Sequence, residues 1–356
     1  MGVFDGMLGA NESLFRNAVA LDFDFVPKLV PYREGEQFHI AGCIKPLFSQ
    51  RSGRNLLIHG PPGVGKSVAS RHVLRELQEK ADDIFPLYVN CWQKNTSFKV
   101  ALELCEQLGY RLTHNKNTDD LLAVVMEKLN KGGAVLVLDE VDKLQDQDFL
   151  YVLLERLYRK VIVLISNYQE WGASLDERLR SRLALDVLQF RPYSAEETRG
   201  ILRQRAELAF QPDVFPREAL ERVVAETVQR GDLRVGLHLL KEAGAAAEEK
   251  AARSVSLEHV ETALQRLAQF APRKSAELDE DEQAVLELVK GAPGSKIGDL
   301  YKRYQESGGE MAYKSFQRKV KKLEDGGYID VQRTQGGAEG NTSILTHRGV
   351  KTLDQF

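Results

Sequence analysis

The chain has 356 residues, of which 43% are hydrophobic and 28% are charged, as in an ordinary globular protein of two or three domains. Its formal net charge of −3 argues against a globally basic nucleic-acid binder, so any DNA contact has to come from a local patch. No apolar run approaches the roughly 20 residues that span a bilayer, and the N-terminus lacks the basic-then-apolar pattern of a signal peptide, so we expect a cytoplasmic protein. Cys43, Cys91 and Cys105 are odd in number and lack C-x-x-C spacing, which predicts buried reduced thiols and not a zinc site.

A glycine-rich turn between a predicted strand at 55–59 and a predicted helix at 67–77 fits the phosphate-loop pattern G-x-x-x-x-G-K-[ST] at every fixed position. Backbone N–H groups and the helix dipole at such a turn both point at phosphate, whereas a flexible Gly/Pro turn before a helix is the alternative. Lys66 is predicted to reach the β- and γ-phosphates of ATP or ADP, and the Ser67 hydroxyl to ligate Mg²⁺. The predicted nucleotide-binding residues of this turn are Gly60, Pro61, Pro62, Gly63, Val64, Gly65, Lys66, Ser67 and Val68.

A second motif follows residues 134–138, a continuous apolar run of the kind that forms a strand buried on both sheet faces. The run ends at Asp139 and Glu140, and carboxylates at the carboxyl end of a parallel strand point at the nucleotide crevice. We predict that Asp139 holds Mg²⁺ and that Glu140 orients or deprotonates the attacking water. A solvated acidic loop is the alternative for such a pair.

Two further segments carry candidate catalytic residues. The predicted strand 161–165 ends just before Asn167, which is placed to hydrogen-bond the γ-phosphate or the attacking water, or simply to cap the next helix. The helical pattern that follows presents Arg178 and Arg182, which could act as arginine fingers toward the γ-phosphate of a neighbouring subunit. Ordinary surface arginines are the alternative, because the finger role requires an oligomer.

After residue 191 the pattern changes to helices only, which predicts a helical lid at 191–270 beside a nucleotide-binding core at 1–190. A capping box at Ser194 opens a helix that runs to about residue 210, and Pro216 suits the first turn of the next helix. Tyr32 and Tyr193 are candidates for the walls of an adenine pocket or for core packing.

The C-terminal part predicts a separate module. Residues 271–281 are polar and unpatterned, as in a linker, and three helix-sized segments follow at 282–290, 295–306 and 313–325. Two strands then flank a glycine-rich tip at 335–341, which completes a winged-helix arrangement over 282–356.

The third helix of this module is basic on one side. Phe316, Val320 and Leu323 share one face and should point inward. The polar residues outside that stripe are Lys314, Ser315, Arg318, Lys319, Lys321 and Lys322. Charge gathered on one helix is what docking in a DNA major groove needs, although a solvated face or a protein-binding surface would carry the same pattern.

The order and spacing of these motifs resemble an AAA+ ATPase, and in detail the archaeal origin-recognition/Cdc-type replication initiators. The segments that carry the finer resemblance are Asp24–Pro27, Pro31–Glu36, Tyr88–Gln93 and Gly231–Arg234. The resemblance implies that the region of Arg33 lines the adenine pocket and that Arg234 is a sensor reaching from the lid to the phosphates. It also implies that double-stranded origin DNA is bound by Lys314, Ser315, Arg318, Lys319 and Lys322 of the third helix and by Arg333 of the wing. The replicative minichromosome-maintenance helicase, related initiator subunits or a second copy are the other implied partners.

We therefore expect an α/β AAA+ core with a parallel sheet, an all-helical lid and a C-terminal winged helix, in a nucleoid-associated, slowly hydrolysing ATPase that recognises origin DNA and helps load the replicative helicase. An AAA+ DNA motor of the branch-migration type is one alternative, and a nucleotide-locked regulatory switch is another. The joint at 109–116 between two predicted helices is as compatible with a plain loop as with a DNA contact.

Overall fold

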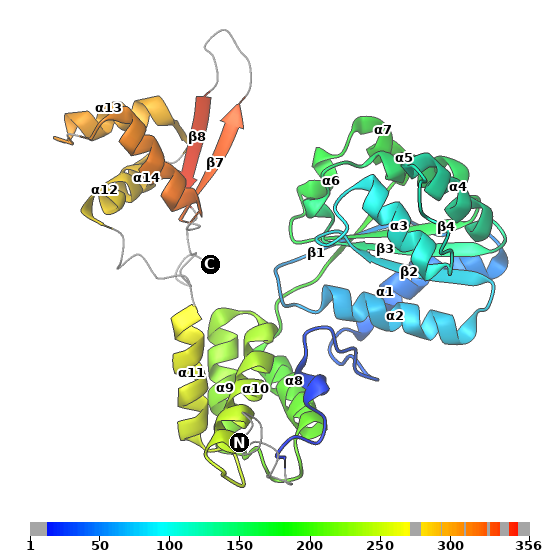
Figure 1. Cartoon of the computed structure of the whole chain (residues 1–356), viewed down its shortest axis with the longest axis horizontal. Coiled ribbons are helices and arrows are strands. Elements are labelled where there is room, and N and C mark those ends of the chain that lie inside the picture. Colours follow the sequence, from blue (N-terminus) through cyan, green and yellow to red (C-terminus); the bar gives the residue numbers. More distant parts are fainter. Residues whose placement is uncertain are drawn as a thin grey trace. The chain divides into compact units, whose positions relative to one another are not determined.

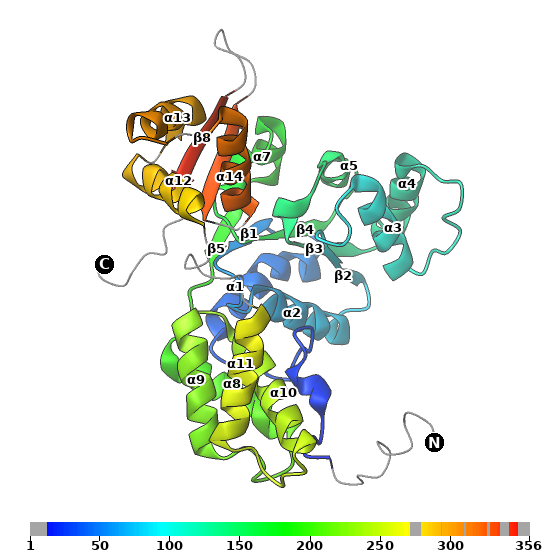
Figure 2. The same ribbon diagram turned by 60° about the vertical axis from the view of Figure 1, so that its left-hand side comes forward.

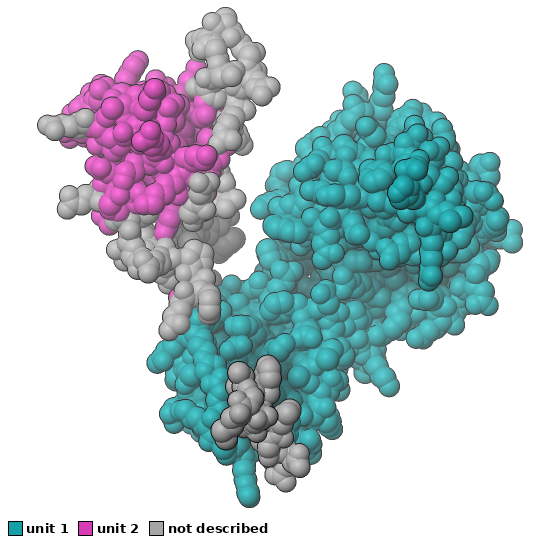
Figure 3. Space-filling view, viewed as in Figure 1, with its two compact units in different colours: residues 1–267 teal, residues 268–356 magenta. Residues whose placement is uncertain are grey.

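The computed structural model of the chain describes residues 13–270, 279–292, 294–309, 311–325, 328–334 and 342–347. The chain divides into two compact units, residues 1–267 and 268–356 (Figure 3). The first unit holds both the core and the lid expected from the sequence, and the finer domain limits remain predictions. Most of the expected linker, residues 271–278, lies outside the described residues, and its end is already the start of a helix.

A five-stranded parallel sheet forms the centre of the first unit, in the order β2-β3-β4-β1-β5 (Figure 1). Every residue of β3 is buried, which explains why this strand reads as a continuous apolar run. The predicted parallel sheet is confirmed. The strands are β1 (Leu56–His59), β2 (Ile84–Asn90), β3 (Gly133–Asp139), β4 (Lys160–Ser166) and β5 (Asp186–Gln189).

Helices cover both faces of this sheet. Successive residues of β3 point to opposite faces of the sheet and pack in two different apolar clusters. Val135 and Val137 belong to the cluster that includes α1 and α2. Leu136 and Leu138 belong to the cluster that includes α3, α4 and α5. The first pair of helices is α1 (Glu34–Ile44) and α2 (Lys66–Lys80); the second group is α3 (Ser97–Gln107), α4 (Thr118–Leu129), α5 (Asp148–Arg156) and α7 (Glu177–Leu183). Short helical turns are η1 (Ala18–Leu21), η2 (Lys45–Ser49), η3 (Val141–Lys143) and α6 (Trp171–Ser174).

Four helices with their own apolar core form the lid (Figure 2). They are α8 (Ala195–Ala209), α9 (Arg217–Arg230), α10 (Leu233–Glu249) and α11 (Leu257–Phe270). The predicted capping box is present at Ser194, which explains where α8 begins. Pro216 is the N-cap of α9 and does not enter its first turn as predicted. The N-terminal segment joins the lid through Phe15, whose ring stacks on Phe210 with 4.7 Å between centroids.

The second unit has the order of elements of a winged helix. Its elements are α12 (Glu280–Gly291), β6 (Ser295–Lys296), α13 (Ile297–Glu306), α14 (Tyr313–Asp325), β7 (Ile329–Thr334) and β8 (Thr342–His347). Phe316, Val320 and Leu323 of α14 are buried, as predicted. Strand β6 was not predicted from the sequence, because a two-residue strand leaves no periodic signal. The predicted glycine-rich tip lies outside the described residues.

Two properties predicted from composition can be compared with the structure. Cys43, Cys91 and Cys105 are buried and none forms a disulfide. In the parts of the chain that the structure describes, no helix combines the length and the apolar character that crossing a bilayer requires.

Candidate nucleotide site and nucleic-acid interface

Three motifs converge at the carboxyl edge of the central sheet. Strand β4 lies between β1 and β3, so the loop after β1, Asn167 after β4 and Asp139 at the end of β3 follow three neighbouring strands. Parallel strands bring such residues together at one edge. A cavity of about 280 Å³ opens there, and its wall is shared by the core, the N-terminal segment and lid helices α8 and α10.

Lys66 lies at the centre of this site. Its side chain is buried, and its Nζ donates hydrogen bonds to the carbonyl oxygens of Gly60 (2.7 Å) and Pro61 (2.9 Å) and to Oδ1 of Asn167 (2.9 Å). Burial lowers the pKa of Lys66 to about 8. All three acceptors are neutral oxygens. The hydrogen bonds therefore orient the ammonium group, but none of them is accepted by a negatively charged partner.

Two glycines of the loop allow the lid to approach closely. Gly63 and Gly65 have φ angles of 76° and 88°, in the left-handed region that favours glycine. A Cβ on Gly65 would lie 2.4 Å from the hydroxyl of Tyr193, and one on Gly63 would lie 1.9 Å from Oδ1 of Asp232. These glycines are therefore required by the backbone conformation and by the lid-side residues that cover the loop.

The acidic pair lies at the wall of the cavity. Asp139 is buried, and its Oδ1 accepts the N–H of Glu140 at 2.9 Å. Glu140 lines the cavity in the left-handed conformation (φ 56°), and burial, followed by the nearby Asp139 charge, raises the pKa of its carboxyl group. The oxygen atoms of Asp139 and Ser67 are hard ligands on the same cavity wall, so the donor set fits Mg²⁺.

The candidate arginines lie in different parts of the first unit. Arg234, at the start of α10 in the lid, lines the cavity. Arg182 and Arg178 lie on α7 and do not belong to the cavity wall. Arg182 forms an ion pair with Glu155 and stacks over the ring of Tyr151 at 4.8 Å, while Arg178 is exposed. Only Arg234 is placed to act within its own chain.

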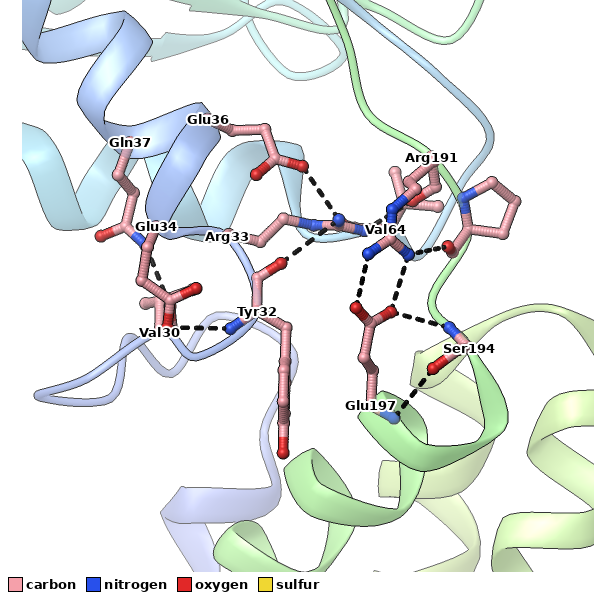
Figure 4. Close-up of polar contacts among 11 residues, drawn as sticks. Val30, Tyr32, Arg33, Glu34, Glu36, Gln37, Val64, Arg191, Ser194 and Glu197 are labelled. Carbon is pink, nitrogen blue, oxygen red and sulfur yellow. Dashed lines mark hydrogen bonds and ion pairs between the residues drawn. The ribbon is translucent and has the colours of Figure 1, made fainter.

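Arg33 is completely buried and does not itself line the cavity, although Pro31 of the same segment does. Its Nε donates to the carbonyl oxygen of Val64 at 3.0 Å, and its guanidinium donates to the carbonyl oxygen of Arg191 at 2.6 Å and pairs with Glu36 (Figure 4). It also stacks on Tyr193 at 3.9 Å. Arg33 therefore supports the phosphate loop by donating a hydrogen bond to a backbone carbonyl oxygen of that loop.

The two candidate adenine-wall tyrosines differ. Tyr193 lines the cavity beside the loop, whereas Tyr32 does not. The hydroxyl of Tyr32 lies against Gly200 of α8, and 39% of the residue is exposed. Tyr32 therefore packs against the lid, whereas Tyr193 lies on the cavity wall between Arg33 and the loop.

Several cavity residues were not assigned to the site from the sequence, although six of them lie in the segments that carry the family resemblance. They come from the N-terminal segment, from β2, from α2 and from the lid: Phe23, Asp24, Pro27, Val30, Pro31, Arg71, Tyr88, Asn90, Ile201, Gln204, Arg205, Leu233 and Leu237. The usable signal was weak: Tyr88 and Asn90 are two residues apart, the spacing of side chains on one face of a strand, and Arg71 is one helical turn beyond Ser67.

The basic residues of α14 fall into two groups. Lys314 and Arg318 are exposed, and Ser315 beside them is half-buried. Arg333 lies in β7, opposite Ser343 of β8, and its side chain is outside the described residues. The N-terminal half of α14 thus presents two exposed cations to a ligand, and Lys321 in the C-terminal half is exposed as well.

The second group is held by the start of α12. Glu282 is 1% exposed, and Lys322 pairs with it at 2.6 Å while Lys319 pairs with it at 3.3 Å and also with Asp279. Asp279 and Glu282 form the capping box that begins α12. Lys319 and Lys322, predicted as DNA contacts, therefore have intramolecular partners that the sequence analysis did not anticipate.

Comparisons with known proteins agree with this geometry. A Cdc6 AAA+ ATPase-type lid domain matches residues 199–265 and an AAA domain matches residues 50–170. Together with the sheet and the phosphate loop, these matches define an AAA+ ATPase with a Cdc6-type lid.

The "ORC1-type DNA replication protein 2" of Methanothermobacter thermautotrophicus is 31% identical over 95% of this chain and 93% of its own length. The "ORC1-type DNA replication protein 3" of Haloarcula marismortui is 30% identical over 96% of this chain and 95% of its own. The chain belongs to this family of ORC1-type DNA replication proteins. The structure of the Aeropyrum pernix ORC1 protein in complex with DNA has a TM-score of 0.69 and 27% identity, with 95% and 94% of the two chains covered.

Proposed function

We propose that this protein is a DNA replication initiator that binds ATP with Mg²⁺, hydrolyses it slowly, and binds duplex origin DNA through its winged helix. Loading of the replicative minichromosome-maintenance helicase, alone or with related initiator subunits or a second copy, is the proposed outcome. The proposed location is the cytoplasm, on the nucleoid.

One observation carries the nucleotide part of this proposal: the buried ammonium of Lys66, which donates to three neutral oxygens at a cavity. Burial of an ammonium group is unfavourable, and the carboxylates of Asp139, Asp142 and Glu140 offset it only in part, since the pKa of Lys66 remains lowered. The β- and γ-phosphates of ATP would supply further negative charge, on the side where the loop presents its backbone N–H groups. Binding of the triphosphate therefore relieves a cost that is built into the folded protein.

The same residues suggest how the chain assists hydrolysis. Mg²⁺, held by Ser67 and Asp139, would neutralise charge on the phosphates. Glu140, on the cavity wall beside Asp139, would orient the attacking water and accept its proton. Asn167 holds Lys66 in place before nucleotide binds. Arg234 stabilises phosphoryl charge from the lid, and an arginine supplied by a neighbouring subunit would complete the site, which accounts for the slow basal rate we propose.

Two substitutions test this assignment by separating binding from hydrolysis. Lys66→Ala should abolish tight ATP binding, because the loop loses its cation. Glu140→Gln should keep ATP binding and reduce single-turnover hydrolysis by about two orders of magnitude or more, because general-base catalysis is worth roughly 10²–10⁴-fold. Equilibrium binding of ATP and single-turnover hydrolysis measure the two effects. Unchanged ATP affinity in Lys66→Ala would falsify the phosphate-loop assignment.

DNA binding is proposed on two grounds. The family match includes an ORC1 protein whose structure was determined in complex with DNA, and the N-terminal half of α14 presents exposed cations, Lys314 and Arg318. Footprinting of the full-length protein on chromosomal DNA, with and without ATP, tests the proposal of an origin. Footprints spread evenly along the chromosome would argue against a sequence-specific initiator.

A further inference from the structure

Tyr88 reaches from β2 to the carboxylate that we assign to Mg²⁺. Its hydroxyl donates a 2.5 Å hydrogen bond to Oδ2 of Asp139, while Oδ1 of the same carboxylate accepts the N–H of Glu140 at 2.9 Å. An ionised carboxylate has about four lone-pair positions. Since one position on each oxygen is filled by a fixed donor, the carboxylate can turn only by breaking a hydrogen bond, and its remaining positions have a set direction.

The tyrosine is itself held in place. The guanidinium of Arg71, from α2, lies over its ring at 4.2 Å and pairs with Asp24 of the N-terminal segment at 3.0 Å. An ordinary phenol has a pKa of about 10, so the Tyr88 hydroxyl keeps its proton over the physiological range and acts as a donor to the carboxylate. All four residues line the nucleotide cavity. The stacked guanidinium of Arg71 thus holds the face of the ring, and the carboxylate of Asp139 holds its hydroxyl.

We propose that Tyr88 is a positioning residue, which aims the Asp139 carboxylate at the Mg²⁺ of bound nucleotide, and that Arg71 holds the tyrosine in the position required. The inference rests on the proposed nucleotide site. It assigns the hydroxyl a role that acts through Asp139 and requires no contact between Tyr88 and the reacting phosphate.

The test removes the hydroxyl and keeps the ring. Affinity for a fluorescent ATP analogue is measured in Mg²⁺ and in EDTA, for wild type, Tyr88→Phe and the control Tyr158→Phe, whose residue is 75% exposed and outside the cavity wall. Loss of a hydrogen bond to a charged group changes an equilibrium constant by about tenfold or more. The gain in affinity that Mg²⁺ produces should therefore be about tenfold smaller in Tyr88→Phe than in wild type. The affinity in EDTA should be the same in both proteins. The control should behave as wild type.

A second variant tests the role of Arg71. Arg71→Lys keeps a positive charge near Asp24 and loses the planar group that stacks on the ring. It should reduce the Mg²⁺-dependent gain in otherwise wild-type protein and have a smaller effect in the Tyr88→Phe background, because both changes act through the same carboxylate. Additive losses would overturn the part assigned to Arg71.

The remaining outcomes distinguish this inference from the proposed function. Wild type that binds no nucleotide would overturn both, and Lys66→Ala, measured in parallel, shows what loss of binding looks like. Normal Mg²⁺-dependent binding by wild type together with an unchanged gain in Tyr88→Phe would overturn the positioning role alone. Equal losses in Mg²⁺ and in EDTA would also overturn it, since they would indicate a general packing defect.

Discussion

At the scale of single residues, the site is built from groups whose positions are fixed before any nucleotide arrives. Lys66 is oriented by two loop carbonyls and Asn167, and Asp139 is held by the hydroxyl of Tyr88 and by the next peptide N–H. Such preorganisation lowers the cost of reorienting charged groups when phosphate binds. Substitutions at these positions should therefore change binding and turnover more than they change folding.

The arginines give a prediction at this scale. Arg234 lines the cavity of its own chain, so Arg234→Ala should reduce turnover by about tenfold or more even in dilute monomer, because it removes charge stabilisation of the transferring group. Arg182→Ala should leave the dilute monomer unchanged and lower turnover only where subunits meet, since Arg182 lies off the cavity wall. Steady-state ATPase rates over a range of protein concentrations measure both effects.

A mixing experiment provides the control. A Glu140→Gln subunit with intact Arg182 should restore activity to an Arg182→Ala partner, whereas the Glu140→Gln, Arg182→Ala double variant should not. Equal loss of monomer turnover in Arg182→Ala and Arg234→Ala would contradict the role in trans.

At the scale of elements, charged pairs decide how helices begin and which of their faces stay accessible. Glu197 closes the capping box of α8 with Ser194 and takes a two-pronged ion pair from Arg191. Asp279 and Glu282 cap α12 and, at the same time, hold two lysines of α14. In both cases residues that a sequence pattern assigns to a cap also fix a neighbouring segment.

The cap of α8 gives a pH prediction. Hydrogen bonds from Arg191 lower the pKa of Glu197 to about 2, so its contribution to stability is complete above the ordinary pKa of 4.5 and is lost as the pH falls through about 2. Glu197→Gln should lower the melting temperature by about 2 °C at neutral pH, a small effect because Arg191 is largely exposed. The difference between the two proteins should shrink as the pH falls below 4.5. A constant difference from pH 7 to pH 3 would show that the carboxylate charge is not involved.

The two halves of α14 should respond differently to substitution. Lys314→Ala or Arg318→Ala should flatten the slope of log K against log salt on duplex DNA by about 0.9 for each phosphate that the side chain neutralises in the wild type. A residue that reads a base edge should instead cost about 1–3 kcal/mol and relax preference at one position. Gel-shift titrations at several salt concentrations distinguish these effects.

Lys319→Ala is the matched comparison on the same helix. The substitution leaves the buried carboxylate of Glu282 paired with one lysine instead of two. We therefore expect a lower melting temperature and an unchanged slope of log K against log salt. A slope that flattens as much in Lys319→Ala as in Lys314→Ala would show that these ion pairs open when DNA binds.

At the scale of the whole molecule, two units with separate apolar cores divide the work. The nucleotide cavity belongs entirely to residues of the first unit, and the basic helix α14 to the second. Each unit can therefore be studied by itself, and DNA binding can be measured with and without the nucleotide-binding unit.

The fragment 273–356 should keep part of the DNA binding, because its core of α12, α13, α14 and the small sheet is independent of the ATPase unit. We expect salt-dependent binding that is weaker than that of the full chain if the first unit adds phosphate contacts. The measurement compares gel shifts of fragment and full chain at two salt concentrations, with and without ATP. Absence of salt-sensitive binding in both would favour a protein-binding role for the winged helix.

The sequence by itself determined those features that depend on neighbouring residues. The glycine loop before Ser67, the apolar run that ends at Asp139, the capping box at Ser194 and the inward stripe of α14 are all local patterns, because backbone conformation and periodicity act over a few residues. These patterns were sufficient to place β1, β3 and β4, the nucleotide motifs, and the three helices and hairpin of the C-terminal unit, whereas β2, β5 and β6 were not predicted.

Tertiary structure alone decided which distant side chains meet. It buried Arg33 behind the phosphate loop, brought Tyr88 of β2 onto Asp139 of β3, and paired Lys319 and Lys322 with the start of α12. These contacts join residues that are separated by 31 to 51 positions, and their partners follow from how helices and strands pack and not from any local spacing. For that reason the motifs could be read from the chain, while the groups that position them could be seen only in the fold.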